Sequence, residues 1–120
     1  MTDRKKKILV AEDDQGIADV VKTILEMNGF EVFIAVDEQG VKSMKTDLPD
    51  LLLLDLWMGH SDGKIICRAL KSQPSTKHIP IILVSATRDL AKAAEEFGAD
   101  DFLEKPFDMD NLVKKIRKFL

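Results

Sequence analysis

Five short runs of apolar residues recur along the chain, at residues 8–11, 30–36, 51–54, 81–84 and 102–103. Polar residues, glycine or proline bound them, as is typical of strands buried in a parallel sheet. The four leucines at 51–54 could also belong to a helix, but Pro49 before them and the glycine-containing loop at 59–63 limit the length of this segment. We therefore predict a strand at each of the five runs.

A segment with apolar residues on one helical face follows each predicted strand. The clearest covers residues 15–28, where apolar residues recur at the spacing of a helix between a capping Asp14 and a terminating Gly29. A weaker stripe follows Asp37 and consists of Val41, Met44 and Leu48. Three further helices are predicted over 64–72, over 90–97 before Gly98, and from Asp108 to Phe119.

This alternation of strand and helix predicts an α/β fold. Strands of this kind form a parallel sheet with right-handed crossovers and helices on both faces, a doubly wound arrangement rather than a barrel or a sandwich. A chain of 120 residues is the usual size for one domain with one substantial core. We expect a single domain over residues 1–120, of which residues 1–6 form a flexible basic N-terminus.

Charge and composition narrow the function classes. A net charge of −3 opposes direct binding to nucleic acid or to an anionic membrane. Cys67 has no second thiol to pair with and no metal-ligand spacing around it, which favours a reducing compartment. The basic run at residues 4–7 precedes too few apolar residues for a secretory signal, and no segment is long enough to span a membrane. We expect a cytoplasmic location.

Charged and hydroxyl side chains follow four of the predicted strands: Glu12 and Asp13, Asp55, Ser85, and Lys105. In an open α/β sheet the ligand site lies beyond the carboxyl ends of the strands, so these side chains are predicted to meet at one edge. Carboxylates brought together in this way repel one another unless a cation joins them, and hard oxygen ligands suit Mg²⁺ or the similar Mn²⁺. The sequence therefore predicts a divalent metal site.

The same four strand ends suit phosphoryl chemistry. A carboxylate can accept a phosphoryl group when a metal ion and a lysine neutralise the charge of the transferring group. Lys105 and the Ser85 hydroxyl come from separate strand ends and could both contact the phosphoryl oxygens. Each residue alone is weak evidence, because strand ends commonly carry caps and solvated side chains. Their joint occurrence is specific.

Five segments resemble the receiver domain of the response regulators of two-component signalling. They are residues 7–14 (KILVAEDD), 49–55 (PDLLLLD), 61–63 (SDG), 84–86 (VSA) and 105–107 (KPF). Their order, spacing and strand-end positions agree together, and the resemblance covers the whole chain. It implies a flavodoxin-like fold of five βα units with strand order 2-1-3-4-5, similar to the chemotaxis regulators, and a bacterial signalling protein rather than a conventional enzyme.

The resemblance also implies roles for individual residues. Asp55 would be the phosphorylated aspartate, and Asp13 and Asp55 would bind Mg²⁺ directly, together with the backbone carbonyl of Trp57. Glu12 would hold the ion through water, and Lys105 would pair with the phosphoryl group. The Lys105-Pro106 bond is a candidate cis peptide.

The resemblance further implies a switch and its partners. Ser85 would turn to bond the phosphoryl group, and the aromatic ring of Phe102 would move into the space that Ser85 vacates. This movement would change the face formed by the fourth helix, fifth strand and fifth helix, where a downstream protein or output domain reads the state. The phosphodonor would be a sensor histidine kinase or a histidine phosphotransfer protein. The chain would catalyse only its own Mg²⁺-dependent phosphorylation and dephosphorylation.

Three other functions remain to be compared with this one. A flavin-binding protein of the same topology needs a phosphate-binding loop after the first strand, where residues 12–14 are all acidic and would repel phosphate. A phosphatase or phosphotransferase with an aspartyl nucleophile would have a second acid two residues after Asp55, and Trp57 occupies that position. A receiver-like interaction module that is never phosphorylated stays the main alternative.

Overall fold

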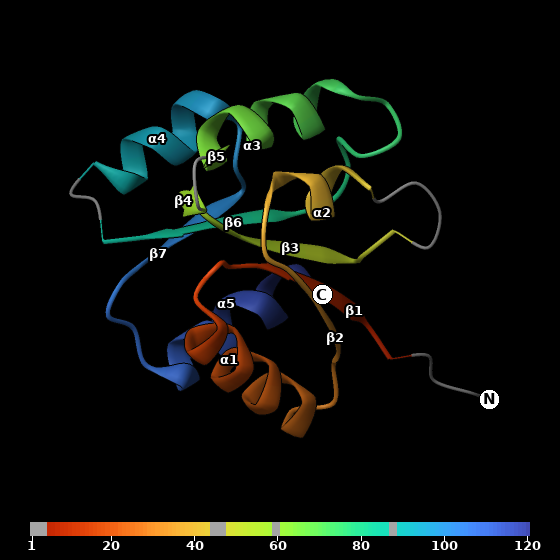
Figure 1. Ribbon diagram of the computed structural model, residues 1–120, viewed down its shortest axis with the longest axis vertical. Helices are drawn as coiled ribbons and strands as arrows, with labels where there is room; N and C mark the ends of the chain where they lie inside the picture. Colours follow the sequence, from red (N-terminus) through yellow and green to blue (C-terminus); the bar gives the residue numbers. More distant parts are fainter. Residues whose placement is uncertain (1–4, 44–47, 59–60, 87–88) are drawn as a thin grey trace.

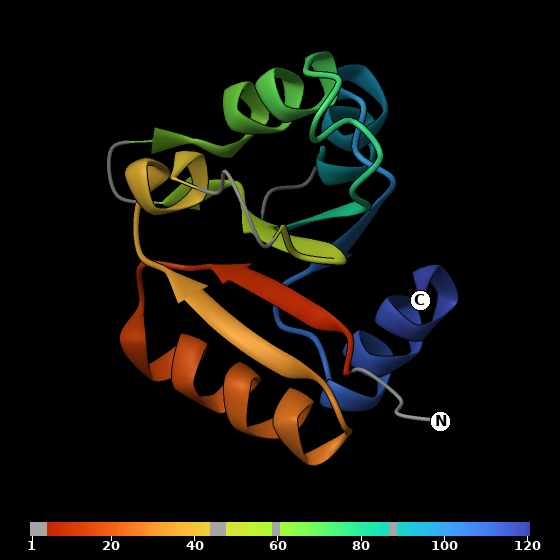
Figure 2. The same ribbon diagram turned by 90° about the vertical axis from the view of Figure 1, so that its right-hand side faces the viewer.

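The computed structural model describes residues 5–43, 48–58, 61–86 and 89–120 of the chain. Its centre is a five-stranded parallel sheet with helices on both faces (Figures 1 and 2). The strands are β1 (Lys7–Ala11), β2 (Glu31–Ala35), β3 (Leu51–Asp55), β6 (Ile81–Ser85) and β7 (Asp101–Glu104), in the order β2-β1-β3-β6-β7. Because β4 and β5 lie outside this sheet, the order is the predicted 2-1-3-4-5, and the doubly wound α/β fold is confirmed.

Five helices form the two outer layers: α1 (Gln15–Met27), α2 (Glu38–Lys42), α3 (Gly63–Ser72), α4 (Leu90–Phe97) and α5 (Met109–Phe119). Figure 2 shows α1 and α5 together on one face of the sheet, and α2, α3 and α4 on the other. Within the described ranges, no helix is both long enough and apolar enough to cross a membrane.

The predicted helix ends are confirmed by hydrogen bonds and backbone angles. The Asp14 carboxylate caps α1 by accepting a hydrogen bond from the Ile17 N–H at 3.1 Å, and Asp108 caps α5 in the same way. Gly29 and Gly98 adopt positive φ values of 91° and 84° just after α1 and α4. These left-handed conformations favour glycine and terminate the two helices.

Two sequence predictions need correction. The loop predicted at residues 59–63 contains β5 (Ser61–Asp62), which pairs antiparallel with β4 (Trp57–Met58). Two-residue strands are too short to leave a recognisable period. The second helix was predicted to reach Leu48, whereas α2 ends at Lys42 with Ser43 as its C-cap. The Ser43 hydroxyl donates to the Gly40 carbonyl at 2.9 Å there, and such side-chain bonds to the backbone compete with continuation of a helix. Met44 and residues 59–60 lie outside the described residues.

The leucine run of β3 explains why the sheet has two cores. Leu52 and Leu54 point into the core beneath α3 and α4, while Leu51 and Leu53 point into the core against α1 and α5. All five residues of the strand are buried, as expected for a central strand with helices on both faces. The strand therefore fixes the position of Asp55 at its carboxyl end.

Gly63, the first residue of α3, packs directly against the backbone that follows β3. A Cβ atom at this position would lie 2.6 Å from the Asp55 carbonyl oxygen and 2.9 Å from Leu56 Cα. The Gly63 N–H also donates a hydrogen bond to the Leu56 carbonyl at 2.7 Å. Since backbone atoms rather than a flexible side chain occupy the space, only glycine fits without moving the segment after Asp55.

Replacing Gly63→Ala should lower the free energy of unfolding by about 1–3 kcal/mol, because the new methyl group overlaps backbone atoms. Urea unfolding followed by circular dichroism measures this change. Gly16→Ala in α1 is the control, since its nearest neighbour is the exposed Asp14 side chain at 3.3 Å, and it should alter stability by less than about 1 kcal/mol. Equal effects of the two substitutions would contradict the prediction.

Candidate functional site

Three carboxylates meet at the carboxyl ends of β1 and β3. Glu12 and Asp13 follow β1, and Asp55 is the last residue of β3, which pairs directly with β1. One oxygen from each of the three carboxylates lies within 4.8 Å of the others. Glu12 and Asp55 are buried, whereas Asp13 is exposed to solvent. The structure thus brings the predicted acidic residues together, and the parallel pairing of β1 with β3 is the reason.

Lys105 reaches this cluster from the end of β7, the edge strand that β6 separates from β3. Its Nζ donates hydrogen bonds to Glu12 Oε1 at 3.0 Å and to Asp55 Oδ2 at 3.1 Å. Its backbone N–H donates to the Ser85 carbonyl at 2.9 Å, so β6 supports it. The peptide bond from Lys105 to Pro106 is cis. One ammonium group therefore contacts two carboxylates at the carboxyl ends of two other strands, β1 and β3.

Burial and neighbouring charges shift the pKa values of Glu12 and Lys105. The pKa of Glu12 is raised to about 7: burial is the largest cause, and the neighbouring Asp55 adds to it, while the hydrogen bonds from Lys105 and from the Asp14 N–H offset part of the rise. Burial alone would lower the pKa of Lys105, but its hydrogen bonds and charge interactions with Glu12 and Asp55 raise it above the ordinary value. The carboxylates thus retain an excess of negative charge that a cation would relieve.

The donor atoms of this cluster fit a hard divalent cation. Carboxylate oxygens are the ligands that Mg²⁺ prefers, and Mg²⁺ commonly uses one or two of them while keeping several waters. The exposed Asp13 leaves one side of the cluster open to solvent. The Trp57 N–H donates to Asp55 Oδ1 at 3.1 Å, which fixes the start of the following segment against the cluster. The Trp57 carbonyl as a ligand stays a prediction.

Ser85 and Phe102 occupy neighbouring strands near the cluster. Ser85 is buried at the end of β6, and Phe102 on β7 lies opposite Leu83 of β6. Because alternate residues of a strand share one face, Ser85, Leu83 and Phe102 all belong to the face that carries α4. Phe102 is only partly buried there. Their predicted roles in a switch remain predictions, but both residues are on the same side of the sheet.

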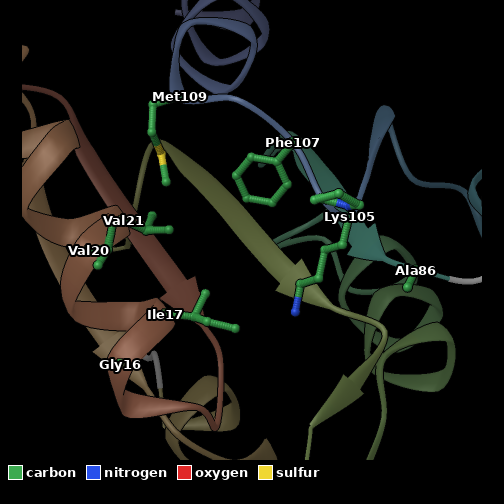
Figure 3. A pocket seen from close by; sticks show the side chains of 9 residues that line it. Gly16, Ile17, Val20, Val21, Ala86, Lys105, Phe107 and Met109 are labelled. Atoms are coloured by element: carbon green, nitrogen blue, oxygen red, sulfur yellow. The ribbon is translucent and has the colours of Figure 1, made fainter.

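An apolar pocket of about 440 Å³ opens beside Lys105, between α1 and the segment that leads from β7 into α5 (Figure 3). In Figure 3, Ile17, Val20 and Val21 from α1 face Phe107 and Met109 across the opening. Val20 exposes 52% of its surface. Ile17, Val20 and Val21 belong to the apolar stripe predicted over residues 15–28, and periodicity does not show how much of a stripe the neighbouring elements cover.

Comparison with known proteins agrees with this site. A family model described as the response regulator receiver domain matches residues 8–117. The chain is 36% identical over 117 residues to the DNA-binding dual master transcriptional regulator RpaA of Synechocystis, covering 95% of this chain and 48% of RpaA. The chain spans about half the length of such curated relatives, or less.

Solved structures give the same result. The signal receiver domain of a signal transduction histidine kinase from Syntrophus aciditrophicus has a TM-score of 0.88 and 33% identity, with 96% of this chain and 89% of that chain covered. The chemotaxis response regulator CheY4 of Vibrio cholerae has a TM-score of 0.88 and 25% identity, with 98% of this chain and all of that chain, 100%, covered. The likeness extends over the whole domain.

The raised pKa of Glu12 predicts a pH dependence of stability in the absence of metal. Between pH 4.5 and about 7 the folded chain retains a proton on Glu12 that the unfolded chain has lost, so the free energy of unfolding should fall as the pH rises through this range. Glu12→Gln should remove this part of the slope. Urea unfolding in EDTA at several pH values measures it.

The control for this prediction is Glu26→Gln, which changes an exposed residue of α1. The Glu26→Gln chain should keep the pH dependence of the unaltered chain. Added Mg²⁺ should favour ionised Glu12 and reduce the loss of stability near neutral pH. The prediction is wrong if Glu12→Gln and the unaltered chain show the same slope without metal.

Proposed function

The chain belongs to the response regulator receiver domain family, and we propose that it accepts a phosphoryl group from a histidine kinase or a histidine phosphotransfer protein onto Asp55. The observation that carries this proposal is the contact of the Lys105 ammonium with both Asp55 and Glu12, at 3.1 Å and 3.0 Å. This geometry gives Asp55 a cation on one side and an acidic, solvent-open cluster on the other.

The proposed reaction uses residues that already contact one another. An oxygen of Asp55 attacks the phosphorus atom, the P–N bond to the donor imidazole breaks, and the imidazole nitrogen keeps the electron pair. Lys105 exchanges its hydrogen bond with Asp55 Oδ2 for one with a phosphoryl oxygen, which neutralises part of the added charge. Asp13, Asp55 and the Trp57 carbonyl would hold a Mg²⁺ ion, with Glu12 acting through water, and the ion would supply further charge neutralisation.

The output of the phosphorylated chain is proposed to be a change of the face made by α4, β7 and α5. Ser85 would turn toward the phosphoryl oxygens, and the Phe102 ring would move inward. The curated relatives are longer than this chain, so the downstream partner is either another protein or a further segment of the same protein. Sensor kinases transfer phosphate in the cytoplasm, where we place the chain.

A receiver-like interaction module that is never phosphorylated is the competing proposal. It would need no acidic cluster and no lysine over the acceptor, yet Glu12, Asp13, Asp55 and Lys105 are all present and grouped. The two proposals differ in one measurable property, which is the covalent modification of Asp55.

Incubation with Mg²⁺ and a small phosphodonor such as acetyl phosphate should add one phosphoryl group to the chain, seen by intact mass, and change the fluorescence of Trp57. Asp55→Asn should abolish both signals. Asp19→Asn, an exposed carboxylate on α1, should leave them unchanged. A chain that shows neither signal with Mg²⁺ present supports the interaction module instead.

The apolar pocket beside Lys105 is the surface on which we propose that the phosphodonor docks. It lies next to the ammonium that contacts Asp55, so a donor helix seated there would bring its phosphohistidine near the acceptor. Exposed apolar surface rimmed by polar residues is typical of protein interaction sites. The half-exposed Val20 is the pocket residue on which a single substitution should act most directly.

A panel of phosphorylated histidine kinases is first screened for the one that transfers its phosphoryl group fastest to the unaltered chain. Val20→Glu should lower the transfer rate from that kinase about tenfold. The rate with acetyl phosphate should not change, because a small donor needs no docking surface. Met27→Glu adds the same charge at a 78% exposed apolar residue of α1 outside the pocket and serves as control. If Val20→Glu lowered the rate with the kinase and the rate with acetyl phosphate equally, docking at this pocket would be contradicted.

A further inference from the structure

Lys115 on α5 contacts both the ring of Phe102 and the carboxylate that precedes it. Its Nζ lies 4.9 Å from the centroid of the Phe102 ring and donates a hydrogen bond to Asp101 Oδ1 at 2.9 Å. The same oxygen accepts the Phe102 N–H at 2.8 Å. A carboxylate on β7 therefore joins the backbone of Phe102 to the ammonium that sits over its ring.

This contact is not an ordinary surface ion pair. The Asp101 side chain is only 13% exposed and that of Lys115 only 28%. Burial alone would raise the pKa of Asp101, but the hydrogen bonds from Lys115 and from the Phe102 N–H lower it below the ordinary value. The carboxylate thus stays charged and holds the ammonium in one place, which strengthens the attraction between the ammonium and the ring.

Phe102 has no hydroxyl group, and the face of its ring is the part that attracts a cation. In this structure the ring is partly exposed and packs at the edge of the core beneath α4. Moving the ring inward would separate it from Lys115, since an ammonium group cannot follow into the core without losing its water and its bond to Asp101. The contact therefore favours the partly exposed position of the ring.

We propose that Lys115 is a positioning residue that holds Phe102 in this partly exposed position and thereby opposes the phosphorylated state of the domain. The inference rests on the proposed function, in which Phe102 moves inward when Asp55 is phosphorylated. A contact made only with the outward ring lowers the population of the inward state. A ligand that selects the inward state must then overcome the free-energy difference between the two states, which weakens its apparent affinity. Loss of the contact should therefore tighten binding of such a ligand.

The test is a titration of the chain with beryllofluoride and Mg²⁺, followed by the fluorescence of Trp57. Lys115→Met should bind beryllofluoride about two- to fivefold more tightly than the unaltered chain, the range expected from loss of one cation–ring contact. Lys115→Arg keeps a cation over the ring and should remain close to the unaltered chain. Lys114→Met removes the same charge from an exposed neighbour on α5 and should not tighten binding.

A second pair of variants tests whether the effect acts through the ring. In a Phe102→Leu chain, Lys115→Met should leave the beryllofluoride affinity unchanged, because the contact is already absent. The inference is overturned if Lys115→Met does not tighten binding, or if it tightens binding equally in the Phe102→Leu chain. Either result leaves the proposed function intact, provided that the unaltered chain binds beryllofluoride and Asp55→Asn does not. If the unaltered chain does not respond, both proposals fail.

Discussion

Two buried carboxylates that share a single ammonium are the constraint on which the rest of this site depends. Glu12 and Asp55 lie at the ends of neighbouring strands and are both buried, and burial together with the nearby Asp55 makes ionisation of Glu12 less favourable. Lys105 compensates part of this charge through two hydrogen bonds. The pKa of Glu12 is nevertheless raised to about 7, because burial and, after it, the neighbouring Asp55 outweigh the hydrogen bond from Lys105. Such a site is arranged to gain stability from a further cation.

The parallel sheet, and not the local sequence around each residue, determines this arrangement. Asp55 is held by a strand that is buried over its whole length, and Gly63 lies against the backbone immediately after it. Lys105 is held by the bond from its N–H to the Ser85 carbonyl. Because parallel strands deliver their carboxyl ends to one edge, Lys105 forms hydrogen bonds with residues that are 50 and 93 positions away in the sequence.

The central parts of the fold and site could be predicted from the sequence because they depend on strong, regular signals. The apolar runs at β1, β3 and β6 predicted the parallel sheet, and the resemblance to receiver domains supplied its strand order. Glu12, Asp55 and Lys105 follow strands of that sheet, which predicted that they meet at one edge. Weak signals failed: β4 and β5 are too short for a period, and α2 ends before Leu48. The position of Lys115 over Phe102 was not predicted either, since it depends on how α5 packs on β7.

The pairing of β6 with β7 limits how a signal could pass from Asp55 to the surface. The two strands are hydrogen-bonded in register from Ile82 with Asp101 to Ser85 with Glu104, and the Lys105 N–H extends this pairing to the Ser85 carbonyl. Sliding one strand past the other would break several of these bonds at once, each with a cost of about 1 kcal/mol. Rotation of the Ser85 hydroxyl, the Phe102 ring and the Lys105 amine breaks none of them. A switch in this domain is therefore expected to act through side chains on a fixed backbone, and so a single cation such as Lys115 can bias it.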